Sequence, residues 1–446
     1  MRTTSSLRGR RTKLAAVAGL ATCAVLATGC GSSGSSTNSG SKDSSAGGQI
    51  TLHVGTFGQF GYKEAGLYKA YEAAHPNIKI VEDTNTDAQK YWDALKTHMA
   101  AGSGVDDIQA IEVGYIAEAT SKMADKFVDL SKASGVDSSA WVDYKWKQAT
   151  TTGGQTIGLG TDIGPMAICY RKDLFAKAGL PTDRDAVGKL WAGSWEKYLE
   201  VGKQFQAKAP AGTKFVDSSG GIFNAVVSSQ AEQYTDASGA LVYDKSAGVK
   251  KAWDLSVQAI QDGLSTGLQQ FDQGGTWAAG FKNGKFATIS CPSWMTGTIQ
   301  TNAGDTGKGK WDIAAAPVSA NWGGSFLGVP KVGQHQEEAI KLASWLTAPE
   351  QQAKIFAQFG NIPSTKAGLD STEVQNAKLA YFNDAPTGKI YSDIAKSITP
   401  APIGPWDGQV KDIITKNGLL DIEQHHTDPA KAWSNVVKAI KDKTDN

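Results

Sequence analysis

The chain has few cysteines, no large excess of charge and few long apolar runs. Its 446 residues include four cysteines, and 45 basic residues nearly balance 44 acidic ones. So few cysteines exclude a small disulfide scaffold, whereas the length allows two domains, each with its own core. After residue 29 no apolar run approaches the about 18 residues that a membrane-spanning helix needs. A nucleic-acid partner would require concentrated positive charge, so the charge balance argues against one.

Enzyme signatures are also absent. The sequence has no G-x-S-x-G, no His-Glu-x-x-His and no cysteine set with metal-ligand spacing, and its histidines are scattered except for His425-His426. Residues 304–310 match the first seven positions of a phosphate loop, but Trp311 in the eighth cannot supply the hydroxyl that binds magnesium, so we predict a turn. We therefore expect no catalytic residue, no metal and no cofactor. A pair of distant carboxylates, as in glycosidases, remains open.

The N-terminal residues have the pattern of a targeting signal. Five basic residues precede an apolar run at 14–26, which Ala27-Thr28-Gly29-Cys30 follows. The run is about 13 residues long, too short to cross roughly 30 Å of hydrocarbon as a helix. The pattern resembles a bacterial lipoprotein signal, which implies that residues 1–29 are removed and that Cys30 becomes the lipidated first residue. The alternative is a secretory peptide cut elsewhere, with Cys30 incidental.

A Gly/Ser-rich segment, residues 30–48, follows the signal and is predicted to be a flexible tether. It would hold a globular body on the extracytoplasmic face of the cell membrane. Without residues 1–29, 40 basic residues face 44 acidic ones, so the mature chain is slightly acidic.

Two cysteines remain for the folded part, Cys169 and Cys291. Each lies in an apolar, strand-like run, 166–170 and 286–291, so neighbouring strands would bring them within reach. An oxidising compartment favours a disulfide between them. Two buried free thiols are equally compatible with the sequence.

Apolar periodicity predicts strands that alternate with helices. The expected strands are 50–54, 78–81, 108–113, 166–170 and 286–291. The expected helices are 62–74, 91–101, 116–126, 174–179, 248–262, 337–347, 349–359 and 430–441. This alternation predicts an α/β fold with a parallel sheet covered on both faces, and ligands in such sheets bind beyond the carboxyl ends of the strands.

Four blocks of the sequence then indicate a family. Residues 166–181 resemble the "yNkdLFkkAGL-P" stretch of the solute-binding proteins of carbohydrate ABC importers, with Arg171 in place of the usual Asn. Residues 195–198 look like the following "tWdEl" signal, which an inserted segment, 182–194, separates from the first block. Residues 281–294 resemble the "F.nGkaAM...gsW" block. Residues 323–331 with 339–349 resemble "gGg.lgvsk...eaAwkFl.wltspe". No single block is specific to this family, but the four blocks in this order are.

The resemblance implies a two-lobe periplasmic-binding-protein fold, type II-like, in which each lobe is a sheet flanked by helices and a hinge joins the lobes. We predict one lobe from 49–163 and 318–370, and the other from 164–317 and 371–446. It also implies a sugar ligand, delivery to ABC permease subunits served by a separate ATPase, and a monomeric receptor that closes by a hinge motion.

Thirteen tryptophans suggest stacking platforms for sugar rings, although any single one can equally be core. Trp294 and Trp322 occupy the positions at which the family places ligand-stacking aromatics. Trp277 and Trp406 lie in glycine-containing turns, where core packing explains them less well.

The predicted polar partners of the ligand follow strands or lie at a crossover. Asp162 lies at a predicted crossover between lobes, where it serves either a sugar hydroxyl pair or a turn. The other candidates lie in predicted loops, at a strand end or in a helix, and are Gln59, Phe60, Asp87, Glu112, Tyr115 and Asn224.

The tryptophan content favours a ligand of two or more rings, a di- to trisaccharide. We expect β-linked chains such as cellobiose, or xylo- and chito-oligosaccharides, because flat chains lie across successive aromatic planes. The signal and tether are reminiscent of cello-oligosaccharide-binding proteins of actinobacteria. Two rivals stay open: a secreted lipoprotein glycosidase, and a receptor of the same fold for a non-sugar solute.

Overall fold

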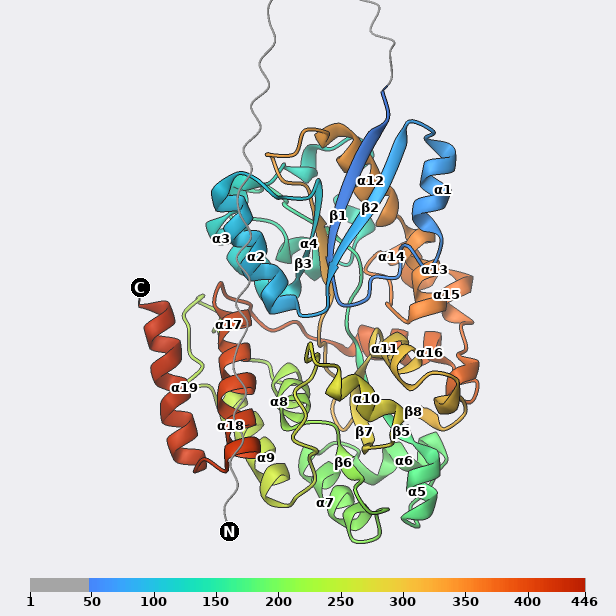
Figure 1. The fold of residues 1–446 in the computed structure, drawn as a ribbon, viewed down its shortest axis with the longest axis vertical. Coiled ribbons are helices and arrows are strands. Elements are labelled where there is room, and N and C mark those ends of the chain that lie inside the picture. The colour runs from blue at the N-terminus through green and yellow to red at the C-terminus, as the bar shows by residue number, and fades with distance from the viewer. Residues whose placement is uncertain (1–47, 446) are drawn as a thin grey trace, which may run out of the picture. The chain divides into compact units, whose positions relative to one another are not determined.

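Two separate β-sheets organise residues 48–445, the range that the computed structural model describes (Figure 1). The predicted signal peptide, Cys30 and the tether up to residue 47 lie outside the described residues. The first sheet has the order β2 (Ile78–Asn85), β1 (Ile50–Phe57), β3 (Ile108–Glu112), β9 (Ser325–Gly328), β4 (Leu159–Gly160). The second has the order β6 (Lys214–Val216), β7 (Phe286–Pro292), β5 (Met166–Arg171), β8 (Trp311–Ala314).

Helices surround both sheets. Those from the first half of the chain are α1 (Leu67–Ala74), α2 (Ala88–Ala101), α3 (Val113–Lys122), α4 (Asp143–Gln148), α5 (Lys172–Lys177), α6 (Arg184–Trp191), α7 (Trp195–Gln206) and α8 (Ser219–Ser228). The later ones are α9 (Ala247–Gln261), α10 (Thr276–Lys282), α11 (Met295–Ala303), α12 (Gln336–Leu346), α13 (Pro349–Phe359), α14 (Lys366–Asp370), α15 (Thr372–Gln375), α16 (Thr387–Ser397), α17 (Asp407–Asp412), the π-helix η6 (Ile413–Leu419), α18 (Leu420–His425) and α19 (Pro429–Thr444). Short 3-10 helices are η1 (Ala124–Lys126), η2 (Leu130–Lys132), η3 (Ser138–Ala140), η4 (Asp305–Gly307) and η5 (Ala380–Phe382).

Local sequence signals explain where several helices begin. α13 starts at Pro349, the first-turn position that suits proline because no intrahelical N–H is lost there. The inserted segment 182–194 forms α6, whose N-cap Asp183 accepts hydrogen bonds from the backbone of residues 185 and 186. The phosphate-loop-like stretch contains η4 and leads directly into β8, as expected of a turn.

Both sheets are mixed, which corrects the prediction of a parallel sheet. β2, β1 and β3 are parallel, but β9 runs antiparallel to both β3 and β4. In the second sheet β5 is antiparallel to β7 and β8, and β6 is parallel to β7. Alternation along the sequence identifies parallel neighbours only when a helix returns the chain within one sheet. β9 instead arrives from the other sheet, so its direction does not follow from local pattern.

Both faces of each sheet carry buried residues that pack on helices, as predicted, although one side of the edge strand β2 stays exposed. In the first sheet, Ala110 packs with α1 and α12, and the next residue, Ile111, packs with α2 and α3 on the opposite face. In the second, Met166 and Ile168 pack against α7, α8 and α9, whereas Ala167 packs against α10, α11 and α16. The chain passes between the sheets at residues 161–165 and 315–324. The lobe boundaries predicted from sequence stay a prediction.

The two remaining cysteines meet in the second sheet. A disulfide joins Cys169 on β5 to Cys291 on β7, with Cα atoms 5.3 Å apart. Their register is diagonal, because Cys169 pairs with Ile289 and Cys291 with Ala167. Among residues 48–445, no helix has the length and apolar character needed to cross a membrane.

Replacing both cysteines by alanine is expected to lower the free energy of unfolding by about 2–5 kcal/mol, because the disulfide closes a long loop and restricts the unfolded chain. The two positions are 122 residues apart in sequence. Guanidinium unfolding with and without dithiothreitol measures the effect. The reductant should destabilise the wild type and leave the double variant unchanged; equal unfolding curves for the wild type in both conditions would contradict a structural disulfide.

Candidate functional site

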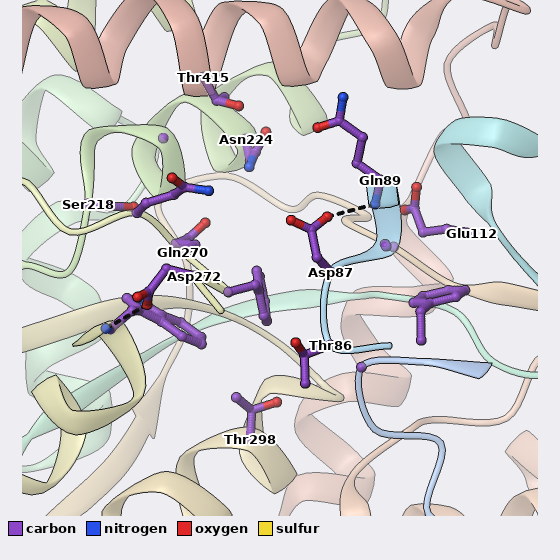
Figure 2. Close-up of a pocket in the computed structure, with 18 of the residues that line it drawn as sticks. Thr86, Asp87, Gln89, Glu112, Ser218, Asn224, Gln270, Asp272, Thr298 and Thr415 are labelled. Carbon is purple, nitrogen blue, oxygen red and sulfur yellow. Dashed lines mark hydrogen bonds between the residues drawn. The ribbon is translucent and has the colours of Figure 1, made fainter. Parts of the chain in front are cut away.

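A cavity of about 590 Å³ lies where loops connected to the two sheets face each other. In Figure 2, Thr86, Asp87, Gln89 and Glu112 surround the same space as Ser218, Asn224, Gln270, Asp272, Thr298 and Thr415. The first set follows the carboxyl ends of β2 and β3, and the second comes from α8, the loop before α10, α11 and η6. Carboxyl ends of parallel strands are the expected binding position in an α/β fold.

Aromatic rings form one part of the cavity wall. Phe57 and Phe60 meet edge to face at 5.3 Å, and Trp294 and Trp322 at 5.8 Å between ring centroids. The indole N–H of Trp294 donates to the backbone carbonyl oxygen of Trp322 at 3.1 Å, which fixes the orientation of the Trp294 ring. The wall therefore offers rigid apolar planes to a ligand.

The loop before α10 adds a further ring in an unusual conformation. Phe271 has a φ of 58°, in the left-handed region that bulky side chains avoid, and its ring lies 4.6 Å from that of Trp277. Asp217 holds this loop: one carboxylate oxygen accepts from the indole N–H of Trp277 at 2.8 Å and from the side-chain amide of Gln270 at 2.7 Å. Burial raises the pKa of Asp217 to about 7. Strain of this kind often marks functional sites.

Two carboxylates on the polar side of the cavity are helix caps. Asp87 accepts from the backbone N–H groups of Gln89 and Lys90 at 2.9 and 3.2 Å, at the start of α2. Glu112 accepts from the N–H of Gly114 at 2.8 Å, at the start of α3. Capping fixes the orientation of each side chain before any ligand arrives.

Two lysines from the C-terminal part of the chain pair with these carboxylates. Lys411 lies 3.7 Å from Glu112, and Lys416 lies 3.7 Å from Asp87 and 3.5 Å from Asp412. Burial alone would lower the pKa of Lys411, but Glu112 and Asp412 raise it above its ordinary value. The polar side is thus a fixed array of ion-paired donors and acceptors, in which three carboxylates face two lysines. Such groups can hydrogen-bond the hydroxyl groups of a neutral ligand.

The two crossovers, the segments 161–165 and 315–324 that link the sheets, are hydrogen-bonded to each other beside the cavity. Asp162 accepts from the backbone N–H of Ser325 at 2.8 Å and from the hydroxyl of Thr161 at 2.7 Å, and burial raises its pKa. The N–H of Trp322 donates to the carbonyl oxygen of Gly164 at 2.7 Å. A Cβ at Gly164 would collide with the Trp322 carbonyl, so this close approach requires glycine.

Ten of the eleven side chains that the sequence suggested for ligand binding line this cavity: Gln59, Phe60, Asp87, Glu112, Tyr115, Asp162, Asn224, Trp277, Trp294 and Trp322. Their contact with a ligand stays a prediction. Two of them have clear structural partners as well. Tyr115 is buried, stacks on Trp92 and donates to Asp412 at 2.6 Å, and Trp277 is 2 % exposed with its N–H bonded to Asp217.

Trp406 lies elsewhere, which corrects its inclusion. It does not line the cavity; the ammonium of Lys122 lies 3.3 Å from its ring centroid, and the ring packs beside the core of the second sheet. The turn at Gly404-Pro405 explains its partial exposure but does not determine which way the ring faces.

Sequence reasoning missed several lining residues, among them Phe57, Phe271, Lys411, Asp412 and Lys416. The three C-terminal ones lie on α17 and η6, where charged residues are typical of a solvated helix face. Only the packing of these helices against α3 and α8 brings them to the cavity.

One group of potential metal ligands lies outside the cavity. His53, Asp83 and Asp106 bring one ligand atom each within 4.8 Å of one another. The imidazole of His53 pairs with Asp83 at 3.1 Å, and both side chains are about half exposed. We assign this group no role.

Comparison with known proteins gives a consistent family. The family described as bacterial extracellular solute-binding protein matches residues 66–381. The chain is similar to a lactose-binding protein of Rhizobium radiobacter, with 23% identity over 394 residues that cover 85% of this chain and 88% of that protein.

Solved structures agree. An extracellular solute-binding protein of family 1 is 42% identical, with a TM-score of 0.74 over 89% of this chain and 100% of the other. Two more distant proteins share the fold. A binding protein of B. animalis subsp. lactis Bl-04 in complex with β-1,6-galactobiose is 21% identical, with a TM-score of 0.76 over 89% of this chain and 97% of the other. The galacto-N-biose-/lacto-N-biose I-binding protein of Bifidobacterium longum is 16% identical, with a TM-score of 0.71 over the same shares.

The raised pKa of Asp217 predicts a pH-dependent stability. Because folding raises this pKa from the ordinary value near 3.9 to about 7, the contribution of Asp217 to stability is largest below pH 4 and is lost as the pH rises towards 7. Asp217→Asn cannot ionise. Its unfolding free energy relative to the wild type should therefore rise by about 2–3 kcal/mol from pH 5 to pH 8.

Urea unfolding at pH 5 and pH 8 measures this difference, with the exposed Asp244→Asn as the matched control. A difference between Asp217→Asn and the wild type that is the same at both pH values would show that the carboxyl is already ionised at pH 5.

Proposed function

The chain belongs to the family of bacterial extracellular solute-binding proteins, and we propose on this basis that it captures an oligosaccharide between two lobes and delivers it to an ABC permease. A separate ATPase subunit would drive transport. The family implies an extracytoplasmic location, and its members are binding proteins, so in this proposal no bond of the sugar is made or broken. Lipid on Cys30 would hold the receptor at the membrane, and the receptor would act as a monomer.

The observation that carries the proposal is the composition of the cavity wall. Sugars present apolar C–H faces and hydroxyl edges, so a sugar site combines aromatic planes with fixed polar groups. Trp294 and Trp322 supply the planes, and the capped carboxylates Asp87 and Glu112 with their lysines supply donors and acceptors at the edge. At about 590 Å³ the cavity lies within the range of about 300–1,000 Å³ typical of small-molecule sites.

We infer a ligand of two or three rings, β-linked as in cellobiose. The relatives support the size: one is a lactose-binding protein, and others were solved with β-1,6-galactobiose and lacto-N-biose. The several aromatic rings around the cavity support more than one sugar ring, since each plane needs a face to cover.

The test is tryptophan fluorescence of residues 49–446 titrated with mono-, di- and trisaccharides, while each mixture is assayed for new sugar products. A saturable change with a β-linked disaccharide and no products is the expected result. New products would identify a glycosidase, and an unchanged spectrum across the panel would point to a non-sugar solute.

Removing either aromatic plane should weaken binding of the sugar identified in this way. Trp322→Ala and Trp294→Ala are each expected to raise Kd at least tenfold, about 1.4 kcal/mol, because tryptophans that a ligand covers at the centre of a site carry much of its binding energy. Isothermal titration calorimetry measures Kd.

Trp406→Ala is the matched control, because this tryptophan does not line the cavity, and its Kd should stay within about twofold of the wild type. A loss of affinity in Trp406→Ala as large as in Trp322→Ala would contradict the assignment of the cavity as the sugar site.

A further inference from the structure

Lys145 is a buried amine without a hydrogen-bond partner. Its side chain comes from α4 and is 1 % exposed, and its Nζ atom has no hydrogen-bond partner among residues 48–445. Lysine is almost never fully buried unless it is paired, because an ammonium group loses its hydration in the interior. Lys145 does not line the ligand cavity, so direct contact with a sugar does not explain its position.

The amine lies where the two segments that link the sheets touch. A Cβ added to Gly324, in the second crossover, would lie 2.8 Å from Nζ and 2.8 Å from the backbone carbonyl oxygen of Asp162, in the first. Nζ also lies 3.7 Å from the ring centroid of Phe326 on β9. The absence of a side chain at Gly324 therefore leaves room for the amine beside the hydrogen bond from Ser325 to Asp162.

Two carboxylates are the charged groups that face Lys145. Burial lowers the pKa of Lys145 to about 7, whereas the charges of Asp162, on the crossover, and Glu112, at the end of β3, oppose this shift. Burial also raises the pKa of Asp162. The amine therefore changes its charge close to neutral pH, where an ordinary lysine stays protonated.

The groups that surround these carboxylates keep one charge state near neutral pH. Lys411 pairs with Glu112 at 3.7 Å, and Glu112 and Asp412 raise the pKa of this lysine, so it stays charged. The phenols of Tyr62 and Tyr144 lie near Asp162, and burial raises the pKa of each, so both stay neutral. The strand β9 carries no titratable residue. A proton taken up here near pH 7 is therefore held by Lys145 or shared with Asp162.

Protonation of Lys145 would change what Asp162 offers to a ligand. Asp162 lines the cavity, and its Oδ1 atom already accepts from the N–H of Ser325 and the hydroxyl of Thr161. An ammonium group without a partner is attracted to this carboxylate and competes for it with a ligand hydroxyl. A ligand that covers the cavity also excludes water and adds to the cost of the buried charge. Both effects have the same sign, so ligand binding favours the neutral amine.

We propose that Lys145 is a proton-dependent positioning residue, which acts through Asp162 on the link between the sheets, so that the receptor releases a proton when it binds its sugar. The proton passes from Nζ to the buffer. This inference rests on the proposed function and extends it, because it assigns a regulation by pH to the same site. Linkage is reciprocal, so a sugar that displaces the proton binds more weakly in acid, where the proton is held more firmly.

Isothermal titration calorimetry between pH 5.5 and pH 8.5 tests the proposal, with cellobiose, lactose and β-1,6-galactobiose as probes. The Kd of the wild type should rise about fivefold as the pH falls across this range, the lower end of usual coupling between two sites. Lys145→Met should lose most of this rise. At pH 7, titration in buffers of different ionisation enthalpy counts the protons released, and Lys145→Met should release fewer per sugar than the wild type.

The comparison between variants identifies the group, because Asp217 also titrates near pH 7. Lys147→Met is the matched control, since Lys147 lies two residues further along α4 and is exposed. It removes the same charge from the surface, and should keep the pH dependence and the proton release of the wild type.

Thermal unfolding of Lys145→Met shows independently whether the amine is neutral in the folded protein. Folding lowers the pKa of Lys145 from its ordinary value near 10.4 to about 7, so the cost of burying it is complete below pH 7 and is relieved as the pH rises towards 10. The melting temperature of Lys145→Met relative to the wild type should therefore be higher at pH 6 than at pH 9.

Each other outcome contradicts a distinct part of the proposal. Equal pH dependence and equal proton release in the wild type and Lys145→Met would overturn it while leaving the sugar receptor intact. An equal loss in Lys147→Met would overturn it too, because any lysine charge would then suffice. A melting-temperature difference that is the same at pH 6 and pH 9 would show that Lys145 stays charged. Absence of binding by every probe at pH 8.5 would overturn the proposed function as well.

Discussion

Hydrogen bonds between the two crossovers are the constraint on which the rest of the structure depends. Asp162 accepts from the backbone N–H of Ser325, and the N–H of Trp322 donates to the carbonyl of Gly164. The two segments that link the sheets, 161–165 and 315–324, are therefore joined side by side. The same residues line the cavity, and Trp322 contributes an aromatic plane to it. Because the links between the sheets and the cavity wall are made from the same short segments, a ligand that contacted Trp322 would act directly on the link between the sheets.

The charge arrangement of the cavity follows from local helix chemistry. Asp87 and Glu112 cap α2 and α3, and this role would hold them in place with or without a ligand. Lys411 pairs with Glu112, and Lys416 pairs with Asp87. Both lysines lie on helices, α17 and η6, that pack mainly with the second sheet. A carboxylate that is capped and paired keeps a fixed orientation, which makes it a good acceptor for a neutral hydroxyl.

Local pattern predicted the strands β1, β2, β3, β5 and β7, eight of the helices and ten residues of the cavity wall, for identifiable reasons. The strands around Ile50, Ile108, Cys169 and Phe286 follow from apolar runs, and the ordered family-like blocks placed Trp294 and Trp322. The direction of β9 did not follow from the pattern, because it depends on a crossover and not on neighbouring residues. Likewise, Lys411 and Phe271 reach the cavity through packing between distant segments, and no local spacing distinguishes such residues from an ordinary helix face or loop. The position of Trp406 outside the cavity has the same cause, because the turn before it does not determine what its ring packs against.

Two unfavourable features lie in or beside the cavity wall. Phe271 has a left-handed backbone conformation, and burial opposes the ionisation of the Asp217 carboxyl, so each reduces the stability of the free protein. Asp217 accepts hydrogen bonds from Trp277 and Gln270, on either side of Phe271, and so holds the loop that carries this ring. The stability lost in the free protein therefore fixes the shape of the cavity wall before a ligand arrives, which reduces the cost of ordering that wall on binding.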